Sequence, residues 1–377
     1  MELYRMKKIL QISKYYYPEL GGIEKTAKSI SDAVQGKYEM RVVCFSREKS
    51  NAIDIIDGVK VSRFGSVKVA SQPLSVSIGA KIKHELREYK PDYVIVHEPD
   101  PFLTFWVLKY ISNESKLITY WHSDIIKQKI GEKLLRSLYF KELKRAYRIV
   151  ATSPNYIDGS PYLSRFKEKC MVVPSCVDEK NLIPSDTSHK MAMEIREKNK
   201  EKIICLGIGR VVPYKGFEYL AQVARLVDER FVFFVSGYPG SSTNRINQDT
   251  KDLSNFTLLG ATSDDVQKAY LEAADIFVFP SITKNEAFGL GLAEGMYFGK
   301  PAVTFYIKGS GVNYVNLKDV TGLEVDNRNV EKYAEALKML ADDEGLRKRL
   351  GEAAKARVEH NFLYKQYKDN IMKVFEI

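Results

Sequence analysis

An arginine and a lysine lie close together in a glycine-bounded stretch from Gly207 to Gly216. Arg210 and Lys215 stand between an apolar strand pattern and a helical pattern, so both belong to a strand-to-helix loop. A planar guanidinium and an ammonium beside the positive end of a helix are the groups that suit a diphosphate. The spacing favours anion binding, and two solvated charges on a surface loop are the alternative.

Two glutamates, Glu286 and Glu294, enclose a second glycine-containing stretch after a buried strand pattern. A helix that begins near Gly289 would direct the backbone N–H groups of Phe288, Gly289 and Leu290 toward an anion. Glu286, just before that helix, could contact sugar hydroxyls, and Glu294, more than a turn inside it, could accept hydrogen bonds from ribose hydroxyls. The alternative is an exposed Glu286 and a Glu294 on the polar helix face.

The first half of the chain has two similar positions. Gly21 and Gly22 lie in the first strand-to-helix loop, where glycine lets backbone amides approach a phosphate or a sugar closely. His122 directly follows a later strand pattern, and side chains at that end of a parallel strand face a ligand site. A plain turn and a structural histidine are the alternatives.

Taken in order along the chain, these motifs resemble those of the family-4 retaining glycosyltransferases (glycosyl transferases group 1), which have the GT-B fold. The resemblance covers nearly the whole chain and includes Gly299-Lys300-Pro301 and Thr321-Gly322-Leu323 after the second glutamate. It implies a hexosyltransferase that takes a sugar from a nucleotide diphosphate donor. The acceptor it implies is a sugar or a lipid-linked sugar.

The resemblance also implies roles for individual residues. Arg210 and Lys215 would bind the donor diphosphate, and the loop around Ala261 and Thr262 would hold the base largely through backbone groups. The catalytic residues would be His122, Glu286, Arg210 and Lys215. The donor-binding residues would be Gly21, Gly22, Arg210, Lys215, Ala261, Thr262, Glu286, Phe288, Gly289, Leu290 and Glu294.

No metal and no cofactor besides the nucleotide sugar is expected. Glu98-Pro-Asp100 comes nearest to the Asp-x-Asp motif that holds a divalent cation in other glycosyltransferases, but it lies in the half that should not bind the donor. The stretch from Gly309 to Asn313 resembles a subset that builds bacterial surface polysaccharides, including mannosyltransferases. GDP-mannose is therefore the first expectation for the donor, followed by a UDP-sugar.

The elements that position these residues alternate between strand and helix patterns, which predicts an α/β fold. For the GT-B class this means two Rossmann-like domains whose parallel sheets face across a cleft. The acceptor domain is predicted at 1–185 and the donor domain at 186–360, with a C-terminal helix at 361–377 that packs back on the first. Strands are predicted at 7–13, 40–46, 92–97, 116–121, 148–153, 202–209, 231–237, 256–260 and 275–281.

Helices are predicted after Glu24, Ile78, Phe102, Gly131, Gly216, Asp264, Gly289 and Asn329, and from Glu344 onward with a break near His360. The polar stretch 178–200 contains Pro184 and is predicted to link the domains.

Excess positive charge lies entirely in the first half of the chain. Residues 1–185 contain 31 Lys and Arg against 21 Asp and Glu, whereas residues 186–377 contain 27 of each. The charge peaks between Lys127 and Arg148 on a helical pattern with interleaved apolar residues. This is typical of a helix on an anionic membrane surface, and the alternative is a helix whose apolar stripe packs on its own domain. No nucleic-acid recognition motif accompanies the charge.

The remaining composition is typical of a globular protein, with 45% hydrophobic and 28% charged residues. No apolar run approaches the roughly 20 residues that span a bilayer, and the N-terminal pattern is not that of a secretory signal. We therefore expect a cytoplasmic protein, at most peripherally bound to the inner face of the membrane. The four cysteines lack metal-ligand spacing and are expected to be buried thiols.

Rival functions share part of this pattern. A GT-B nucleotide-sugar epimerase or phosphorylase would use a similar site, and a non-catalytic subunit would bind the donor without transferring it. A dehydrogenase is disfavoured, because the stretch that begins with Gly207 and Gly209 lacks the third glycine and the following acidic residue of a dinucleotide site.

Overall fold

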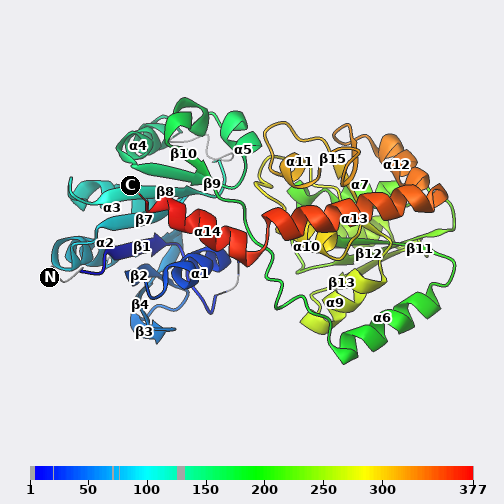
Figure 1. Cartoon of the computed structure of the whole chain (residues 1–377), viewed down its shortest axis with the longest axis horizontal. Coiled ribbons are helices and arrows are strands. Elements are labelled where there is room, and N and C mark those ends of the chain that lie inside the picture. Colours follow the sequence, from blue (N-terminus) through cyan, green and yellow to red (C-terminus); the bar gives the residue numbers. More distant parts are fainter. Residues whose placement is uncertain (1–4, 20, 70–71, 76, 125–131, 377) are drawn as a thin grey trace. The chain divides into compact units, whose positions relative to one another are not determined.

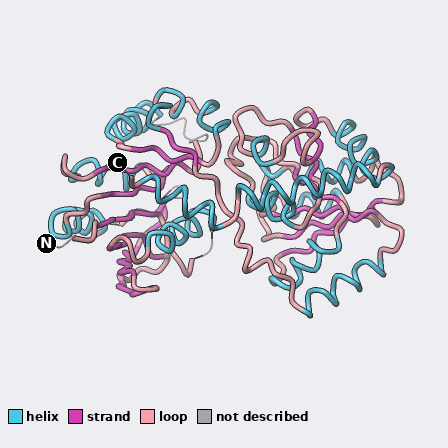
Figure 2. The backbone as a smooth tube through the Cα atoms, in the orientation of Figure 1, coloured by secondary structure: helices cyan, strands magenta, loops and turns pink. Residues whose placement is uncertain are grey.

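The computed structural model describes all residues except 1–4, 20, 70–71, 76, 125–131 and 377. The chain forms two compact units, each with a sheet enclosed by helices (Figure 1). Unit 1 comprises Met1–Thr152, Ile157–Val173 and Tyr367–Ile377, and unit 2 comprises Ser153–Tyr156 and Pro174–Gln366. In Figure 2 the strands of each unit lie together between its helices. Both units have the Rossmann-like arrangement that the sequence predicts.

Unit 1 contains an eight-stranded sheet with the order β10-β9-β8-β7-β1-β2-β4-β3, parallel except for the last pair. Both directions in the sheet start at β1, so the loops after β1 and β7 diverge at a topological switch point. The strands are β1 (Lys8–Ser13), β2 (Glu39–Ser46), β3 (Ala52–Ile56), β4 (Val59–Gly65), β7 (Tyr93–Glu98), β8 (Lys116–Trp121), β9 (Arg148–Ala151) and β10 (Cys170–Val172), besides a separate hairpin of β5 (Val67–Val69) and β6 (Gln72–Leu74).

Helices cover both faces of this sheet because its side chains alternate between them. On one face Leu10 and Val96 pack with Ile78 and Leu103 in a single apolar cluster. On the other face the Gln11 side chain donates to the carbonyl of Ala27, 3.0 Å away. The helices are α1 (Gly22–Val34), α2 (Ile78–His84) with a π-helical turn (Glu85–Tyr89), α3 (Pro101–Tyr110), α4 (Glu132–Arg145), α5 (Pro154–Gly159) and α14 (Tyr364–Val374), with 3-10 turns at Leu163–Arg165 and Lys167–Lys169.

The end of the chain is part of the unit 1 core. The Tyr93 hydroxyl on β7 donates to the carbonyl of Phe375 over 2.7 Å. The Phe375 ring also packs against Tyr93 and Tyr38, with ring centres 5.2 and 5.1 Å apart. Residues 282 positions apart in the sequence therefore complete one aromatic cluster.

Unit 2 contains a six-stranded sheet with the order β13-β12-β11-β14-β15-β16. Every pair in it is parallel, and β11 lies between β12 and β14, so a second switch point separates the loops after β11 and β14. The strands are β11 (Ile203–Ile208), β12 (Phe231–Ser236), β13 (Phe256–Gly260), β14 (Ile276–Phe279), β15 (Ala302–Phe305) and β16 (Gly322–Val325).

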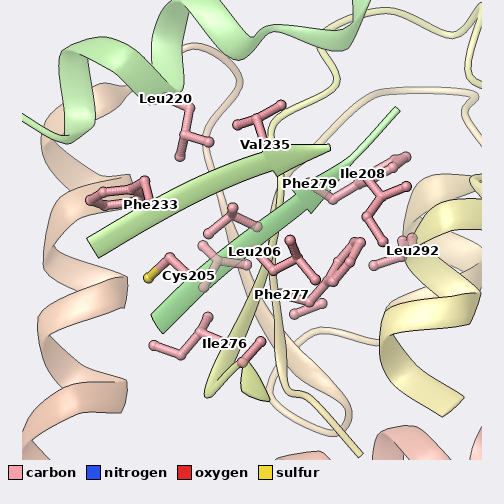
Figure 3. Packing of buried hydrophobic residues seen from close by; sticks show 14 of the residues in the cluster. Cys205, Leu206, Ile208, Leu220, Phe233, Val235, Ile276, Phe277, Phe279 and Leu292 are labelled. Carbon is pink, nitrogen blue, oxygen red and sulfur yellow. The ribbon is translucent and has the colours of Figure 1, made fainter. Parts of the chain in front are cut away.

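The unit 2 core fills the space between this sheet and its helices. Figure 3 shows Leu220 of α7 and Leu292 of α10 directed at strand residues that include Leu206 and Phe277. The helices are α6 (Asp186–Lys198), α7 (Phe217–Val223) after a 3-10 turn (Pro213–Lys215), α8 (Thr243–Asp249), α9 (Asp264–Ala273), α10 (Leu290–Tyr297), α11 (Val312–Val315), α12 (Val330–Asp342) and α13 (Glu344–Asn361).

The predicted linker at 178–200 is the main error in the element assignment. Its second half is α6, which begins with a reciprocal cap between Ser185 and Ser188. Ala192 is buried, and Met191 and Ile195 pack against the unit 2 core. These apolar residues anchor the helix on unit 2. The predicted break in the last helical stretch is confirmed, between α13 and α14.

Candidate functional site

The loops after β11 and β14 meet at the carboxyl edge of the unit 2 sheet because these strands are neighbours. Lys215 belongs to the first loop and Glu286 to the second, and their side chains form an ion pair, each only 12% exposed. The ammonium also lies 4.8 Å from the centre of the Phe279 ring. Two residues with separate predicted roles are thus direct partners in the structure.

Glu286 is held from several directions. Its carboxylate accepts a hydrogen bond from the Ser281 hydroxyl over 3.2 Å, and its carbonyl accepts one from the Ser310 hydroxyl over 2.5 Å. Gly311 packs so tightly that a Cβ on it would lie 1.9 Å from the carbonyl oxygen of Ala287. Glu286 is buried, so the alternative of an exposed glutamate is wrong.

Arg210 lies in the same loop as Lys215 but in a different environment. Its side chain is exposed, and within the described part of the chain the guanidinium has neither a hydrogen bond nor an ion pair. The backbone beneath it is fixed, since the Gly209 amide donates to the Ser236 carbonyl over 2.9 Å. Gly237 has a φ of 155°, and a Cβ there would lie 2.0 Å from the Gly209 carbonyl. An exposed guanidinium therefore extends from a loop whose backbone is held by these contacts.

Helix α10 begins where the sequence predicts. Gly289 precedes its first residue with φ 95° and ψ 62°, a left-handed conformation that favours glycine. The amide of Ala293 makes the first intrahelical bond, to the Gly289 carbonyl, so the amides just before Ala293 lie outside the helical ladder. A Cβ on Gly291 would lie 3.2 Å from the Ile208 carbonyl, which puts the helix start against the end of β11. Glu294 lies half-buried about one turn in.

The flanking residues Phe288 and Leu290 differ in exposure. Phe288 is buried and packs edge-on against Phe362, with ring centres 5.3 Å apart, so only its backbone is suited to a ligand. Leu290 is half-buried at the first helical position.

The loop after β13 completes this edge. The Thr262 hydroxyl lies 2.7 Å from the Ser236 hydroxyl at the end of β12, and Ala261 is exposed. The amide of Gly237 donates to the carbonyl of Gly260 over 2.8 Å. All the predicted unit 2 residues therefore follow β11, β13 or β14 at one edge of one sheet.

In unit 1, Gly21 and Gly22 lie at the start of α1. The carbonyl of Gly21 accepts the amide of Lys25 over 2.9 Å, and its own backbone is extended. A Cβ on Gly21 would lie 2.2 Å from a carboxylate oxygen of Glu24, so this acidic group folds back over the positive end of the helix.

His122 follows β8 and is paired with a residue that the sequence analysis did not select. Its Nε2 lies 2.8 Å from Nδ1 of His97, the fifth residue of β7. Burial lowers the pKa of His122 to about 3 and the pKa of His97 well below its usual range. Both imidazoles are therefore neutral. Sequence spacing gives no sign of this pair, because it depends on the register of two strands.

The opposite face of the same strand ends holds buried carboxyl groups. Glu98 accepts hydrogen bonds from the Thr104 hydroxyl (2.5 Å) and the Asp100 amide (2.6 Å), and Asp100 caps α3. Burial raises the pKa of Glu98 well above its usual range and that of Glu142 on α4 to about 8. Glu142 accepts from the Thr119 hydroxyl over 2.9 Å. The carboxyl groups of the Glu98-Pro-Asp100 stretch are thus engaged by the start of α3.

The predicted basic helix is only partly described, since 125–131 lie outside the described residues. In α4, Tyr139 and Leu143 are buried, whereas Arg136, Lys141 and Lys144 are exposed. The apolar stripe therefore packs on its own unit, and the cations face solvent. None of the helices among the described residues is both long and apolar enough to span a bilayer.

Two further features concern the thiol groups and the grouping of metal-ligating side chains. The four cysteines are unpaired thiols, with Cys44 and Cys205 buried and Cys170 and Cys176 half-buried. Across the described ranges, no three His, Cys, Asp or Glu side chains gather in a way that could hold a metal ion.

Known proteins resemble this chain over both units. A family model described as Glycosyl transferases group 1 matches residues 190–357, and one described as Glycosyltransferase Family 4 matches residues 20–181. O-antigen chain mannosyltransferase C of Escherichia coli is 29% identical over 94% of each chain. D-rhamnosyltransferase WbpZ of Pseudomonas aeruginosa is 29% identical over 94% of this chain and 92% of its own.

Solved structures resemble the whole fold. Sucrose-phosphate synthase from Thermosynechococcus elongatus has a TM-score of 0.80 at 16% identity and covers 98% of both chains. HepE of Anabaena in complex with UDP has a TM-score of 0.77 at 16% identity, covering 97% of this chain and 98% of its own. The predicted GT-B fold class is confirmed.

Proposed function

Since the chain belongs to the family-4 glycosyltransferases (glycosyl transferases group 1), we propose that unit 2 binds a nucleotide diphosphate sugar and that the sugar is transferred with retention. One observation carries the proposal, which is that Lys215, Glu286 and the start of α10 share one sheet edge with the exposed Arg210. Cations and a helix N-terminus that converge in this way are suited to a pyrophosphate. Neither an epimerase, a phosphorylase nor a binding subunit is favoured by the relatives.

In this proposal the donor rearranges the Lys215–Glu286 pair. The ammonium turns to the diphosphate beside Arg210, and the Glu286 carboxylate is released to bind hydroxyls of the sugar. Glu294 holds the ribose, and the loop at Ala261 and Thr262 holds the base. The pair keeps both charges satisfied while no ligand is bound, since an unpaired charge at this degree of burial is costly.

Catalysis would consist mainly of charge stabilisation. Breaking the bond between sugar and phosphate leaves negative charge on the departing diphosphate, which Arg210, Lys215 and the amides at Gly289 are placed to neutralise. The acceptor hydroxyl would attack from the face of the leaving group and pass its proton to the phosphate. We propose that no divalent metal is required. Transfer that persists in excess chelator supports this, and transfer restored only by magnesium contradicts it.

The donor is proposed to be GDP-mannose, with UDP-sugars as the second candidate. The printed names of the two relatives, a mannosyltransferase and a D-rhamnosyltransferase, support a mannose-type sugar and a role in surface-polysaccharide synthesis. The structural neighbour in complex with UDP keeps the second candidate open.

A nucleotide-sugar screen by thermal unfolding tests the donor site. A ligand at 100 times its Kd stabilises the folded state by about 2.7 kcal/mol, so the correct donor should raise the unfolding midpoint clearly. Arg210→Ala should lose most of that shift, whereas the matched control Arg245→Ala, an exposed arginine on α8, should keep it. If no nucleotide sugar shifts the wild-type midpoint, the proposed function is wrong.

We further propose that unit 1 binds the acceptor, with Gly21, Gly22 and His122 at its carboxyl edge, and that α4 meets an anionic membrane surface on the cytoplasmic side. Lys141 and Lys144 are the informative positions, because the Arg145 guanidinium is occupied by the carbonyl of Ser112 over 2.7 Å.

The membrane proposal is tested by vesicle sedimentation. A lysine near an anionic surface contributes about 1 kcal/mol, so each of Lys141→Gln and Lys144→Gln should weaken binding to anionic vesicles about fivefold. Lys348→Gln and Lys355→Gln, at exposed positions of α13, serve as controls. Equal sedimentation of both pairs of variants would retire the proposal.

A further inference from the structure

His97 lies on the same sheet face as α1, on the opposite side from the buried carboxyl groups. The Gln11 side chain reaches Ala27 of α1, and the parallel register puts Ile95 beside Gln11. His97 is two residues beyond Ile95, so it faces the same way, and the next register pair puts Tyr120 beside it. The His97 side chain is 1% exposed.

His97 and His122 form one in-plane pair under a tyrosine. Their ring planes differ by 15°, and Nδ1 of His97 lies 2.8 Å from Nε2 of His122. The Tyr120 ring stacks on both imidazoles, with centres 5.5 Å from His97 and 4.9 Å from His122. Nearly coplanar rings at this distance align an N–H of one with the lone pair of the other.

One of the two histidines must donate, and burial decides which. Both rings are neutral, because burial lowers both pKa values. The other nitrogen of His97, Nε2, is buried and has no hydrogen-bond partner among the described residues. If His97 accepted at Nδ1, its only proton would sit on Nε2 as a buried donor without an acceptor, and such donors are rare. If His97 instead donates from Nδ1, its buried Nε2 carries only a lone pair and no proton that needs an acceptor.

We propose that His97 is a positioning residue that fixes the tautomer of His122. The His97 Nδ1–H occupies the lone pair on His122 Nε2, so His122 carries its proton on Nδ1 and presents it as a hydrogen-bond donor. His122 then orients an oxygen of a substrate and cannot act as the general base. The part of this inference that concerns the substrate rests on the proposed function, whereas the tautomer does not.

Histidine-selective ¹⁵N NMR tests the tautomer directly, and the chain has only five histidines to assign. In the wild type, His122 should show a protonated Nδ1 and an unprotonated Nε2. His97→Phe keeps an aromatic ring under Tyr120 but removes the donor, so the His122 nitrogen signals should move toward a mixture of tautomers. His84→Phe, the same change at an exposed histidine, should leave them unchanged. A wild-type His122 protonated on Nε2 would overturn the proposal.

Amide substitutions separate positioning from mere support of the fold. Asparagine places its N–H near the Nδ1 position of histidine and glutamine near the Nε2 position. We expect His97→Phe to lower kcat about tenfold with little change in the donor KM. His97→Asn should restore most of that lost turnover. His122→Asn should retain more turnover than His122→Gln. The reverse order at His122, or equal kcat in the two His97 variants, would contradict the proposal.

The transfer assay and the NMR spectra distinguish a failure of the proposed function from a failure of the tautomer assignment. If no nucleotide sugar supports transfer, the proposed function fails, and the NMR signals still decide the tautomer. If transfer occurs and the signals show Nε2 protonated, the proposed function stands and the inference about His97 is wrong.

Discussion

The carboxyl edges of the two sheets share a topology and differ in electrostatics. At the unit 2 edge, Lys215 and Glu286 form an ion pair, and Arg210 is exposed without a partner among the described residues. At the unit 1 edge, burial keeps His122 neutral and raises the pKa of Glu142 to about 8, so these two groups are uncharged at neutral pH. One strand-to-helix scaffold therefore carries a charged pair in one unit and buried uncharged groups in the other.

The two edges are therefore suited to different chemical groups. An exposed arginine beside a lysine that is paired with a carboxylate suits a diphosphate, whose charge can replace that of the carboxylate. Neutral hydrogen-bond donors held in place suit hydroxyl groups. Such donors orient an uncharged hydroxyl and do not attract anions as a cation would.

Breaking the unit 2 ion pair should have the largest effect on stability. Glu286→Ala leaves the Lys215 ammonium largely buried without its partner, which should cost about 3 kcal/mol in the free energy of unfolding. The double variant Lys215→Met with Glu286→Gln should lose less free energy of unfolding than Lys215→Met and Glu286→Gln lose together as single variants. Urea unfolding followed by far-UV circular dichroism measures this, and additive costs would show that the two groups do not interact.

Removing either cation should slow the reaction, at a cost in activation free energy close to the stability cost above. Arg210→Ala and Lys215→Ala should each lower turnover roughly a hundredfold, about 2.7 kcal/mol, because the departing diphosphate loses a stabilising charge. Arg245→Ala is the control, and steady-state kinetics with the donor found in the screen is the measurement. A loss below about threefold in both site variants would remove these residues from the proposed diphosphate site.

Raising the pH should weaken unit 1 through Glu142. The folded state keeps this carboxyl protonated up to about pH 8, whereas an unfolded chain releases the proton near 4.5. Its contribution is therefore complete below about pH 4.5 and is lost as the pH rises toward 8. Glu142→Gln cannot ionise, so its stability relative to the wild type should improve by at least ~1 kcal/mol between pH 5 and pH 8.

The two tryptophans make this measurement specific. Trp106 and Trp121 both belong to unit 1, so tryptophan fluorescence in urea reports the unfolding of that unit alone. Asp158→Asn, at an exposed carboxylate of the same unit, provides the control. If the wild type and Glu142→Gln respond to pH in parallel, the carboxyl group is not held protonated.

Lowering the pH should weaken unit 1 through the histidines, in the opposite direction. With its folded pKa lowered to about 3 from a usual value of 6.5, His122 contributes stability that is complete above about pH 6.5 and is lost as the pH falls toward 3. The effect should be the smallest of the four. Between pH 6.5 and 4.5 the stability that His122 loses is offset by the stability that Glu142 gains. His122→Asn should show a weaker acid-side loss by the same fluorescence measurement, and an unchanged loss would show that the imidazole is not the group involved.

The sequence predicts what local patterns determine and misses what sheet register determines. Gly289 at the start of α10 and the two loops of Lys215 and Glu286 follow from strand patterns that end in glycine-rich turns. Their mutual contact does not, because nothing in the spacing says that β11 and β14 are neighbours. His97 was missed for the same reason, since only the alignment of β7 with β8 brings it to His122.

Weak patterns explain the remaining misses. Strands β3, β4, β15 and β16 are absent from the predicted strands. Helix α6 lies in the predicted linker because its surface is polar along most of its length. Glu142 lies in the stretch that the sequence analysis interprets as a basic helix, whereas the structure buries it against Thr119 of β8. The helical period alone could have placed Glu142 on the same face as Tyr139 and Leu143.

The contact between Tyr93 and Phe375 has a consequence for biosynthesis. A ribosome makes the strands of unit 1 first, yet the aromatic cluster around Tyr93 lacks its last member until residues more than 280 positions later have been translated. The N-terminal segment of unit 1 therefore exposes the apolar surface around Tyr93 until unit 2 has been synthesised. Expression of residues 1–173 alone would leave that surface uncovered permanently, and supplying the α14 segment as a separate peptide should cover it.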